Sequence, residues 1–137
     1  MKPITYHYDT THDIHVCKVH EASRAAVDAY VELVLHMASN IFSPEKPEAR
    51  YVRILLDFSE ARLFPLKYLQ KRIKEVFATL PVVPPAIYIA YVTSDMVDKS
   101  LIIMLNYFST VRKEDIRQVF SPKDYQKAID WLSSKEG

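Results

Sequence analysis

Two apolar runs, each ending abruptly in polar residues, stand out in the hydrophobic pattern of the chain. The first, residues 51–56, gives way to Asp57 and Ser59. The polar residues that follow the second run, residues 86–92, are Thr93, Ser94 and Asp95. Apolar runs of this length are typical of strands buried on both faces of a sheet. We therefore expect two central strands whose carboxyl ends present polar groups to one crevice, where open α/β sheets usually bind ligands.

Strand patterns also occur at both ends of the chain. Residues 4–8 and 14–19 mix aromatic and β-branched residues around Asp9-Thr-Thr-His-Asp13, a cluster that favours a turn. This pattern predicts an N-terminal β-hairpin. Residues 116–120 are expected to form the last, short strand.

Apolar residues at helical spacing predict about four helices between and after these strands. The first follows an N-cap at Ser23 and extends to about Ser39, and the second begins near Pro65. The third spans roughly residues 97–108. The last follows Ser121-Pro122, and its expected core residues are Tyr125, Ala128, Ile129 and Leu132. The whole order predicts an α/β fold, a single domain over residues 1–137 with a mixed sheet opened by a hairpin and covered by these helices.

Composition and charge narrow the possible functions. Eighteen Lys and Arg against seventeen Asp and Glu give a net charge of +1, so nothing in the overall charge favours nucleic acid as a partner. The only glycine is Gly137, which excludes glycine-rich phosphate loops, dinucleotide fingerprints and the nucleophile elbow. The sequence therefore predicts no cofactor and offers no catalytic motif, so we do not expect an enzyme.

The cellular setting follows from equally simple features. Cys17 is the only cysteine, which excludes an internal disulfide and suits a reducing compartment. The first residues lack the apolar core of a signal peptide, and no apolar run approaches the ~20 residues that a transmembrane helix needs. We expect a cytoplasmic protein without a transmembrane segment.

The order of elements, together with Leu56-Asp57-Phe58-Ser59 and the segment from Val119 to Leu132, resembles the SpoIIAA-like group of STAS domains over nearly the whole chain. STAS domains are named for sulfate transporters and anti-sigma-factor antagonists, and their fold is similar to that of SEC14-type lipid-binding domains. The resemblance implies this fold, a cytoplasmic bacterial setting and a role in binding a protein partner or a small ligand. It does not imply an enzyme.

The resemblance is incomplete at one functional motif. In antagonist members, an Asp-apolar-Ser strand end is followed by an Asp-Ser-Ser-Gly segment whose serine is phosphorylated by a partner kinase. Asp57 and Ser59 match the first part. The second part falls on residues 65–68, Pro-Leu-Lys-Tyr, which contain neither the serine nor the glycine. The resemblance thus implies a member without the phosphoacceptor serine motif.

The candidate residues for binding a ligand or partner lie at the two strand ends and just after the first. They are Asp57, Ser59, Arg62, Thr93, Ser94 and Asp95. Such side chains also serve purely structural roles, with serines capping helices or loops and Asp57 accepting backbone N–H bonds. The sequence leaves both interpretations open and favours the structural one.

Histidines crowd the predicted hairpin, at positions 7, 12, 15 and 20. Imidazoles on paired strands can converge on a transition metal, but this spacing matches no known metal motif, so we predict no metal site. Cys17 lies in the same region. A lone cysteine without a histidine partner is usually a small buried hydrophobe rather than a nucleophile.

Two further segments suggest surfaces for partners. Lys67, Lys71 and Lys74 share a helical face within a basic run from Arg62, which is explained by a solvated face or by docking of an acidic partner or lipid headgroup. Residues 101–105 are apolar nearly all round, which suits a homodimer contact or an apolar ligand pocket.

The favoured hypothesis is a non-enzymatic interaction or regulatory module. The alternative is a carrier or sensor of a small amphipathic, lipid-like ligand, as SEC14-type domains suggest. Either hypothesis is compatible with a homodimer.

Overall fold

The structure is a computed structural model of the whole chain. It describes residues 2–40, 52–79, 87–94, 103, 105–106 and 115–134. Its elements are β1 (Ile4–Asp9), β2 (Ile14–Val19), α1 (Arg24–Asn40), β3 (Val52–Asp57), α2 (Leu66–Thr79), β4 (Ile87–Val92), β5 (Ile116–Phe120), the 3-10 turn η1 (Pro122–Asp124) and α4 (Tyr125–Ser133). The expected α/β class with a mixed sheet is confirmed. The helix predicted near residues 97–108 falls largely outside the described residues.

The sheet has five strands in the order of the sequence, β1-β2-β3-β4-β5. β1 and β2 are antiparallel, and the pairs β2–β3, β3–β4 and β4–β5 are parallel. The β2–β3 register sets Lys18 opposite Asp57, the last residue of β3. Because β2, β3, β4 and β5 run the same way, their carboxyl ends meet at one edge of the sheet.

The β1–β2 turn is held by its own polar side chains. The carboxylate of Asp9 accepts hydrogen bonds from the backbone N–H groups of Thr11, at 3.0 Å, and of His12, at 3.2 Å. Asp13 has a φ of 55°, in the left-handed region that aspartate tolerates better than most residues. The Asp9–Asp13 cluster therefore closes the turn without a glycine.

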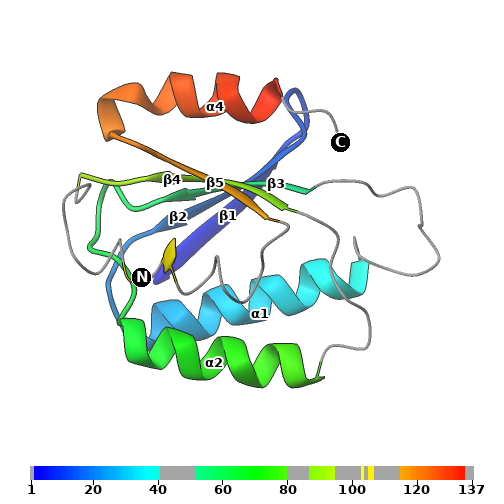
Figure 1. Cartoon of the computed structure of the whole chain (residues 1–137), viewed down its shortest axis with the longest axis vertical. Helices are drawn as coiled ribbons and strands as arrows, with labels where there is room; N and C mark the ends of the chain where they lie inside the picture. The colour runs from blue at the N-terminus through cyan, green and yellow to red at the C-terminus, as the bar shows by residue number, and fades with distance from the viewer. Residues whose placement is uncertain are drawn as a thin grey trace.

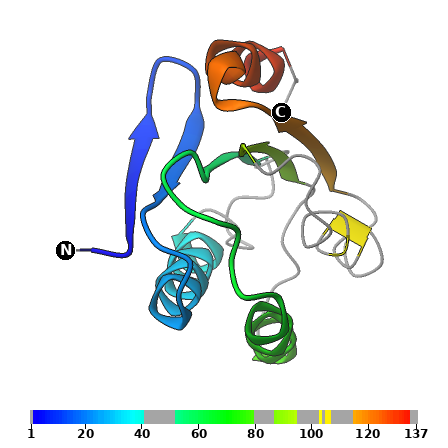
Figure 2. The same cartoon turned by 90° about the vertical axis from the view of Figure 1, so that its left-hand side faces the viewer.

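The helices form separate layers on the two faces of the sheet. α1 and α2 lie against one face and α4 lies against the other (Figures 1 and 2). Side chains alternate between these faces along β3, so Leu56 joins the core beneath α1 and α2, whereas Leu55 joins the core beneath α4. Burial on both sides explains why β3 reads as a continuous apolar run.

The core beneath α4 is the smaller of the two. Its buried helix residues are Ala128, Ile129 and Leu132, and they pack on the α4 side of the central strands. Arg53 of β3 reinforces this layer, because its Nε donates to the carbonyl oxygen of Leu132 at 3.1 Å. α4 packs mainly on β4 and β3. The β1–β2 side of the same face therefore receives less cover.

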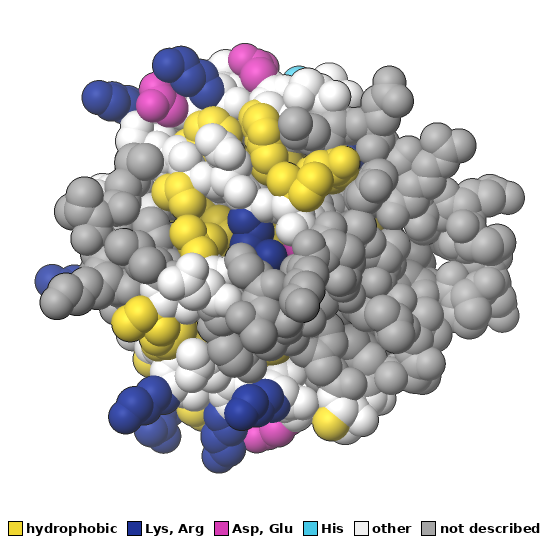
Figure 3. Space-filling model, in the orientation of Figure 1, with side chains coloured by type: hydrophobic (Ala, Val, Ile, Leu, Met, Phe, Trp, Pro, Cys, Tyr) yellow, Lys and Arg dark blue, Asp and Glu magenta, His cyan; other side chains and the backbone are white. Residues whose placement is uncertain are grey.

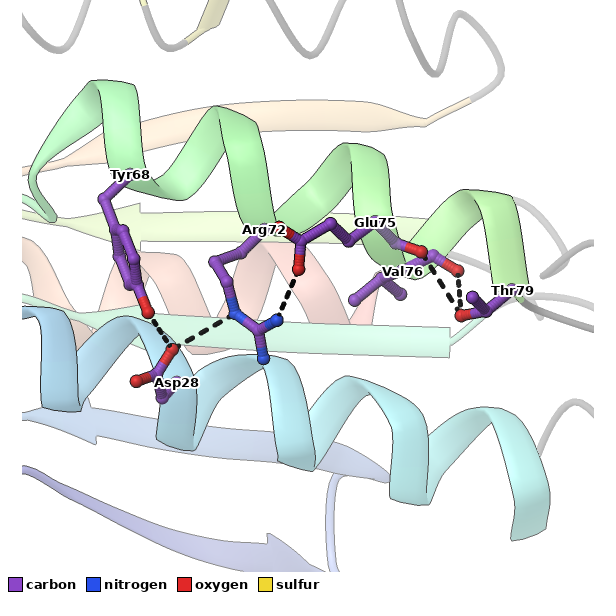
Figure 4. A network of polar contacts seen from close by, with 6 residues as sticks. All are labelled: Asp28, Tyr68, Arg72, Glu75, Val76 and Thr79. Carbon is purple, nitrogen blue, oxygen red and sulfur yellow. Dashed lines mark hydrogen bonds and ion pairs between the residues drawn. The ribbon is translucent and has the colours of Figure 1, made fainter.

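A polar network joins α2 to α1 (Figure 4). The Tyr68 hydroxyl donates to Oδ1 of Asp28 at 2.7 Å, and Nε of Arg72 donates to the same oxygen at 3.1 Å. A second nitrogen of Arg72 donates to Glu75 at 2.7 Å. We call Asp28, Tyr68, Arg72 and Glu75 the α1–α2 network. Each of its side chains has a partner within the network.

Among the helices in the described part of the chain, none combines the length and the apolar character that a membrane crossing requires.

Candidate functional site

A pocket of about 440 Å³ opens on the α4 side of the sheet, next to the carboxyl ends of β2 and β3. Its lining residues are Thr5, His7, Val16, Lys18, Asp57, Ser59, Pro122 and Tyr125. We call it the strand-end pocket. Most of these side chains are polar, in contrast to the apolar cores on either side of the sheet.

The strand pattern explains how these side chains meet. Residues two apart on a strand point to the same face, so β1 supplies Thr5 and His7, and β2 supplies Val16 and Lys18. Asp57 is the last residue of β3 and projects to that face as well. The pocket floor is therefore built on regular strands, which hold side chains more precisely than loops do.

The remaining wall comes from the C-terminal end of the chain. Ser121 accepts a hydrogen bond from the backbone N–H of Asp124 at 2.9 Å, which forms the η1 turn and sets the start of α4. This turn places Pro122 and Tyr125 against the strand ends. Tyr125, expected in the core with Ala128, packs against that core but is only partly buried and also lines the pocket.

Asp57 is the most unusual group in the pocket. It is 5 % exposed, and its Oδ1 accepts a hydrogen bond from the backbone N–H of Ser59 at 2.9 Å. Its Oδ2 makes no hydrogen bond with any residue that the structure describes. Oδ2 is not among the fully buried atoms without a partner in the described structure, so it keeps contact with the open space of the pocket.

Three other polar groups of the pocket also lack a partner, although His7 and Ser59 are exposed and Tyr125 is partly buried. Within the described part of the chain, the ring of His7 and the hydroxyls of Ser59 and Tyr125 make no hydrogen bond. The pocket thus collects donors and acceptors of several kinds that are free to bind something else.

The rim of the pocket is different, because its polar groups bind one another. Nζ of Lys18 lies 3.0 Å from one carboxylate oxygen of Glu60, and Nδ1 of His20 lies 2.8 Å from the other. Nε2 of His20 and the Thr5 hydroxyl are joined by a 2.9 Å hydrogen bond. We call Thr5, Lys18, His20 and Glu60 the rim network. It links β1 and β2 to the turn after β3.

The pKa shifts show that these charges act on one another. The hydrogen bond to Glu60 raises the pKa of Lys18, and the negative charges of Glu60 and Asp57 raise it further. His20 and Lys18 lower the pKa of Glu60 by hydrogen bonding. Burial raises the pKa of Tyr125, and the charge of Asp57 adds to this effect. The field of Asp57 therefore reaches both Lys18 and the Tyr125 hydroxyl.

The structure brings only some of the predicted site residues together. Asp57 and Ser59 line the pocket. Arg62 is exposed and does not line it, Thr93 is fully buried at the end of β4, and Ser94 is exposed away from it. Asp95 lies outside the described residues. The pocket therefore opens on the β2 side of Asp57 rather than towards the polar cluster after β4.

The hairpin histidines do not converge. His7 lines the pocket, and Nδ1 of His12 bonds to Asp9 in the turn at 2.8 Å. His15 lies on the opposite face, where Nδ1 is 2.7 Å from the hydroxyl of Tyr6. The described residues contain no group of three or more His, Cys, Asp or Glu side chains placed to hold a metal ion.

Cys17 is 1 % exposed and belongs to the core beneath α1 and α2, as expected of a small hydrophobe. Burial raises the pKa of its thiol to about 12. The thiolate, which is the nucleophilic form, is therefore scarce at neutral pH.

The basic run of α2 is solvated. Lys67, Lys71 and Lys74 are all exposed, and Figure 3 shows Lys and Arg side chains gathered at the lower edge of the molecule, over α2. Arg72 instead belongs to the α1–α2 network.

The apolar segment at residues 101–105 is described only in part. Ile103 is 48 % exposed, whereas Leu105 is partly buried and packs against the core beneath α1 and α2. The predicted dimer contact lies mostly outside the described residues and stays a prediction.

Comparisons with known proteins return no relative: no family model, no curated protein and no solved structure matches this chain. The geometry of the strand-end pocket is therefore the main ground for assigning a function.

Proposed function

We propose that the chain is a non-enzymatic interaction or regulatory module that holds a polar group of a protein partner or small ligand in the strand-end pocket. The observation that carries this proposal is the contrast between the pocket and its rim. Polar side chains of the rim network bind one another, while Asp57, Ser59 and Tyr125 leave polar atoms without a partner in the described structure. Groups that lack internal partners are available to a ligand.

Oδ2 of Asp57 accepts no hydrogen bond within the described residues and faces the pocket, so a ligand can supply its donor without displacing an internal bond. The side chains are also held on strands and at the start of a helix, so little ordering is needed when the ligand arrives. These features favour binding over a purely structural role for Asp57.

We further propose that the module is STAS-like and lacks the phosphoacceptor serine motif. The five-stranded mixed sheet with helices on both faces supports this, as does the position of Asp57 and Ser59 at the exit of β3. A cytoplasmic bacterial role belongs to the same proposal. In this proposal, Asp57 and Ser59 at the end of β3 bind the partner or ligand, and residues 65–68 provide no serine for phosphorylation.

A carrier of an amphipathic ligand is the alternative, and the pocket supports it less well. The apolar contributions to its lining are Val16, Pro122 and the ring of Tyr125, a small surface for a lipid chain. The exposed lysines of α2 offer a headgroup site, but α2 and α4 lie on opposite faces of the sheet (Figure 1), and the pocket is on the α4 side.

A backbone NMR screen tests the proposed function. The 15N-labelled chain is titrated with small amines, carboxylates, neutral amides and short peptides, and we expect shift changes centred on Thr5, Lys18 and Ser59. The variant Ser59→Trp fills the pocket mouth and should abolish these changes. Its matched control is Ser94→Trp, at an exposed serine outside the pocket.

Two results would contradict the proposal. One is that no probe of any charge shifts residues of the pocket. The other is that mass spectrometry shows a bound probe converted to a product, because a binding module returns its ligand unchanged.

A further inference from the structure

We infer that the group held in the strand-end pocket is a cation, either an ammonium or a guanidinium, and that the carboxylate of Asp57 recognises it. The inference rests on the proposed function and specifies the chemistry of its ligand. It does not depend on whether the ligand is a small molecule or a side chain of a partner.

The balance of charge in the pocket is the first argument. Lys18 is the only Lys or Arg among the lining residues, and Asp57 is the only carboxylate among them. Although the sheet register sets these residues opposite each other, Nζ of Lys18 pairs with Glu60 at 3.0 Å. The positive charge of Lys18 is thus directed to the rim, and the charge of Asp57 has no ion-pair partner in the described structure.

The hydrogen-bonding capacity of Asp57 is the second argument. Oδ1 is occupied by the N–H of Ser59, so Oδ2 is the acceptor that remains. An ionised carboxylate only accepts hydrogen bonds, and ammonium and guanidinium groups only donate them. A charged donor at a carboxylate makes a bond roughly twice as strong as a neutral pair. A bound anion would instead be repelled by Asp57.

The neighbours of Asp57 suit the same ligand. The hydroxyls of Ser59 and Tyr125 can accept the remaining N–H groups of a cation, and neither is engaged within the described residues. The aromatic ring of Tyr125 lines the same space, and a ring face attracts a cation through its quadrupole. One carboxylate, two hydroxyls and an aromatic ring thus surround the space available to the bound group.

Calorimetric titration of the full chain tests the inference. The probes are agmatine, N-acetyl-arginine amide, its uncharged isostere N-acetyl-citrulline amide, and the anionic N-acetyl-glutamate amide. We expect the two guanidinium probes to bind, and the citrulline and glutamate probes to bind about 10-fold to 100-fold more weakly. Tighter binding of agmatine would indicate a small-molecule ligand, and tighter binding of the arginine amide would indicate a partner side chain.

The decisive variant is Asp57→Asn, which keeps an oxygen for the Ser59 N–H and removes the charge. It should weaken binding of the guanidinium probes about 10-fold to 100-fold. The matched control is Asp130→Asn, which removes an exposed carboxylate on α4 outside the pocket and should leave binding unchanged. Thermal unfolding of both variants confirms that they are folded.

The inference is overturned if the guanidinium probes fail to bind at about 10 mM, a concentration that reveals even weak complexes. It is also overturned if Asp57→Asn binds them as tightly as the original chain. The proposed function survives either result if neutral or anionic compounds shift pocket residues in the NMR screen. It fails separately when no compound of any charge does so.

Discussion

In the α1–α2 network a carboxylate, a tyrosine and a cation bind one another, whereas the strand-end pocket contains the same three kinds of side chain without direct bonds between them. Asp28 accepts hydrogen bonds from both Tyr68 and Arg72. Within the described residues, Asp57 accepts a hydrogen bond from one backbone N–H alone, although the charge of Asp57 acts on both Lys18 and Tyr125. Similar residue types therefore serve two different purposes.

The difference follows from what surrounds each set. The α1–α2 network bridges two helices that pack on each other, so its bonds hold elements together (Figure 4). The pocket lies where α4, which packs mainly on β4 and β3, gives less cover to β1 and β2. Asp57, Ser59 and Tyr125 face an open space there rather than another element, so polar atoms of these three side chains stay available. Mutations in the α1–α2 network should therefore change stability, and mutations of the free polar groups in the strand-end pocket should change ligand binding.

The largest expected effect comes from removing the support of the pocket wall. Leu132→Ala deletes a fully buried side chain beneath α4 and should lower the free energy of unfolding by about 2–5 kcal/mol. Chemical denaturation measures this loss. The control is Leu35→Ala on α1, at a residue 37 % exposed, where the loss should be clearly smaller. Equal losses would show that α4 is not anchored as the structure describes.

The next effect compares the two carboxylates directly. Asp28→Asn weakens bonds to Tyr68 and Arg72 and should lower the free energy of unfolding by up to about 1 kcal/mol, a figure reduced because the side chain is half exposed. Asp57→Asn should cause no loss, because Asn keeps the acceptor for Ser59 and the carboxylate it removes has no ion-pair partner among the described residues. Urea denaturation of both variants measures the difference. An equal loss for Asp57→Asn would mean that Asp57 is structural.

A smaller effect compares the two tyrosines. Tyr68→Phe removes a 2.7 Å hydrogen bond to Asp28, so it should lower the unfolding midpoint and leave guanidinium binding unchanged. Tyr125→Phe removes a hydroxyl with no partner in the described structure, so it should leave the midpoint unchanged and weaken agmatine binding roughly 2-fold to 10-fold. Thermal denaturation and calorimetry measure the two responses. The account is contradicted if Tyr68→Phe weakens guanidinium binding and Tyr125→Phe lowers the unfolding midpoint.

The smallest effect concerns His15, which lies on the opposite face of the hairpin from His7 and bonds to Tyr6. Burial lowers the pKa of His15 below 6.5, and the charge of Asp13 opposes this only partly. The unfolded chain then binds more protons than the folded chain, so stability falls as the pH drops from 6.5 through the folded pKa. NMR titration of the ring should give a midpoint below 6.5. A midpoint at or above that value would contradict the described burial.

The sequence predicts the strands of the fold well, because the burial of a strand determines its apolar pattern: a strand buried on both faces is apolar throughout, and one buried on a single face alternates. β3 and β4 were recognised as apolar runs, and Asp57 was recognised as a polar residue at a strand end. β4 lies beside β3, as expected, with Val92 opposite Asp57. The apolar pattern does not show that β2 lies on the other side of β3, and the pocket opens towards Lys18 of that strand rather than towards Thr93 and Ser94.

The other pocket residues were missed for a related reason. Thr5 and His7 lie on β1, at the edge of the sheet. The sequence pattern of exposed polar residues on an edge strand does not show which residues of other elements lie near them. Tyr125 has the helical spacing of a core residue and packs against the core, but its place in the pocket wall depends on the η1 turn. That Oδ2 of Asp57 accepts no hydrogen bond within the described residues follows from three-dimensional contacts, which the apolar pattern does not encode.

The most direct test of the central claim is an NMR titration of the 15N-labelled chain with agmatine. The claim predicts shift changes at the backbone amides of Lys18, Ser59 and Tyr125, none in the α1–α2 network, and loss of these changes in Asp57→Asn. Changes confined to the α1–α2 network, or changes in the pocket that persist in Asp57→Asn, would contradict it.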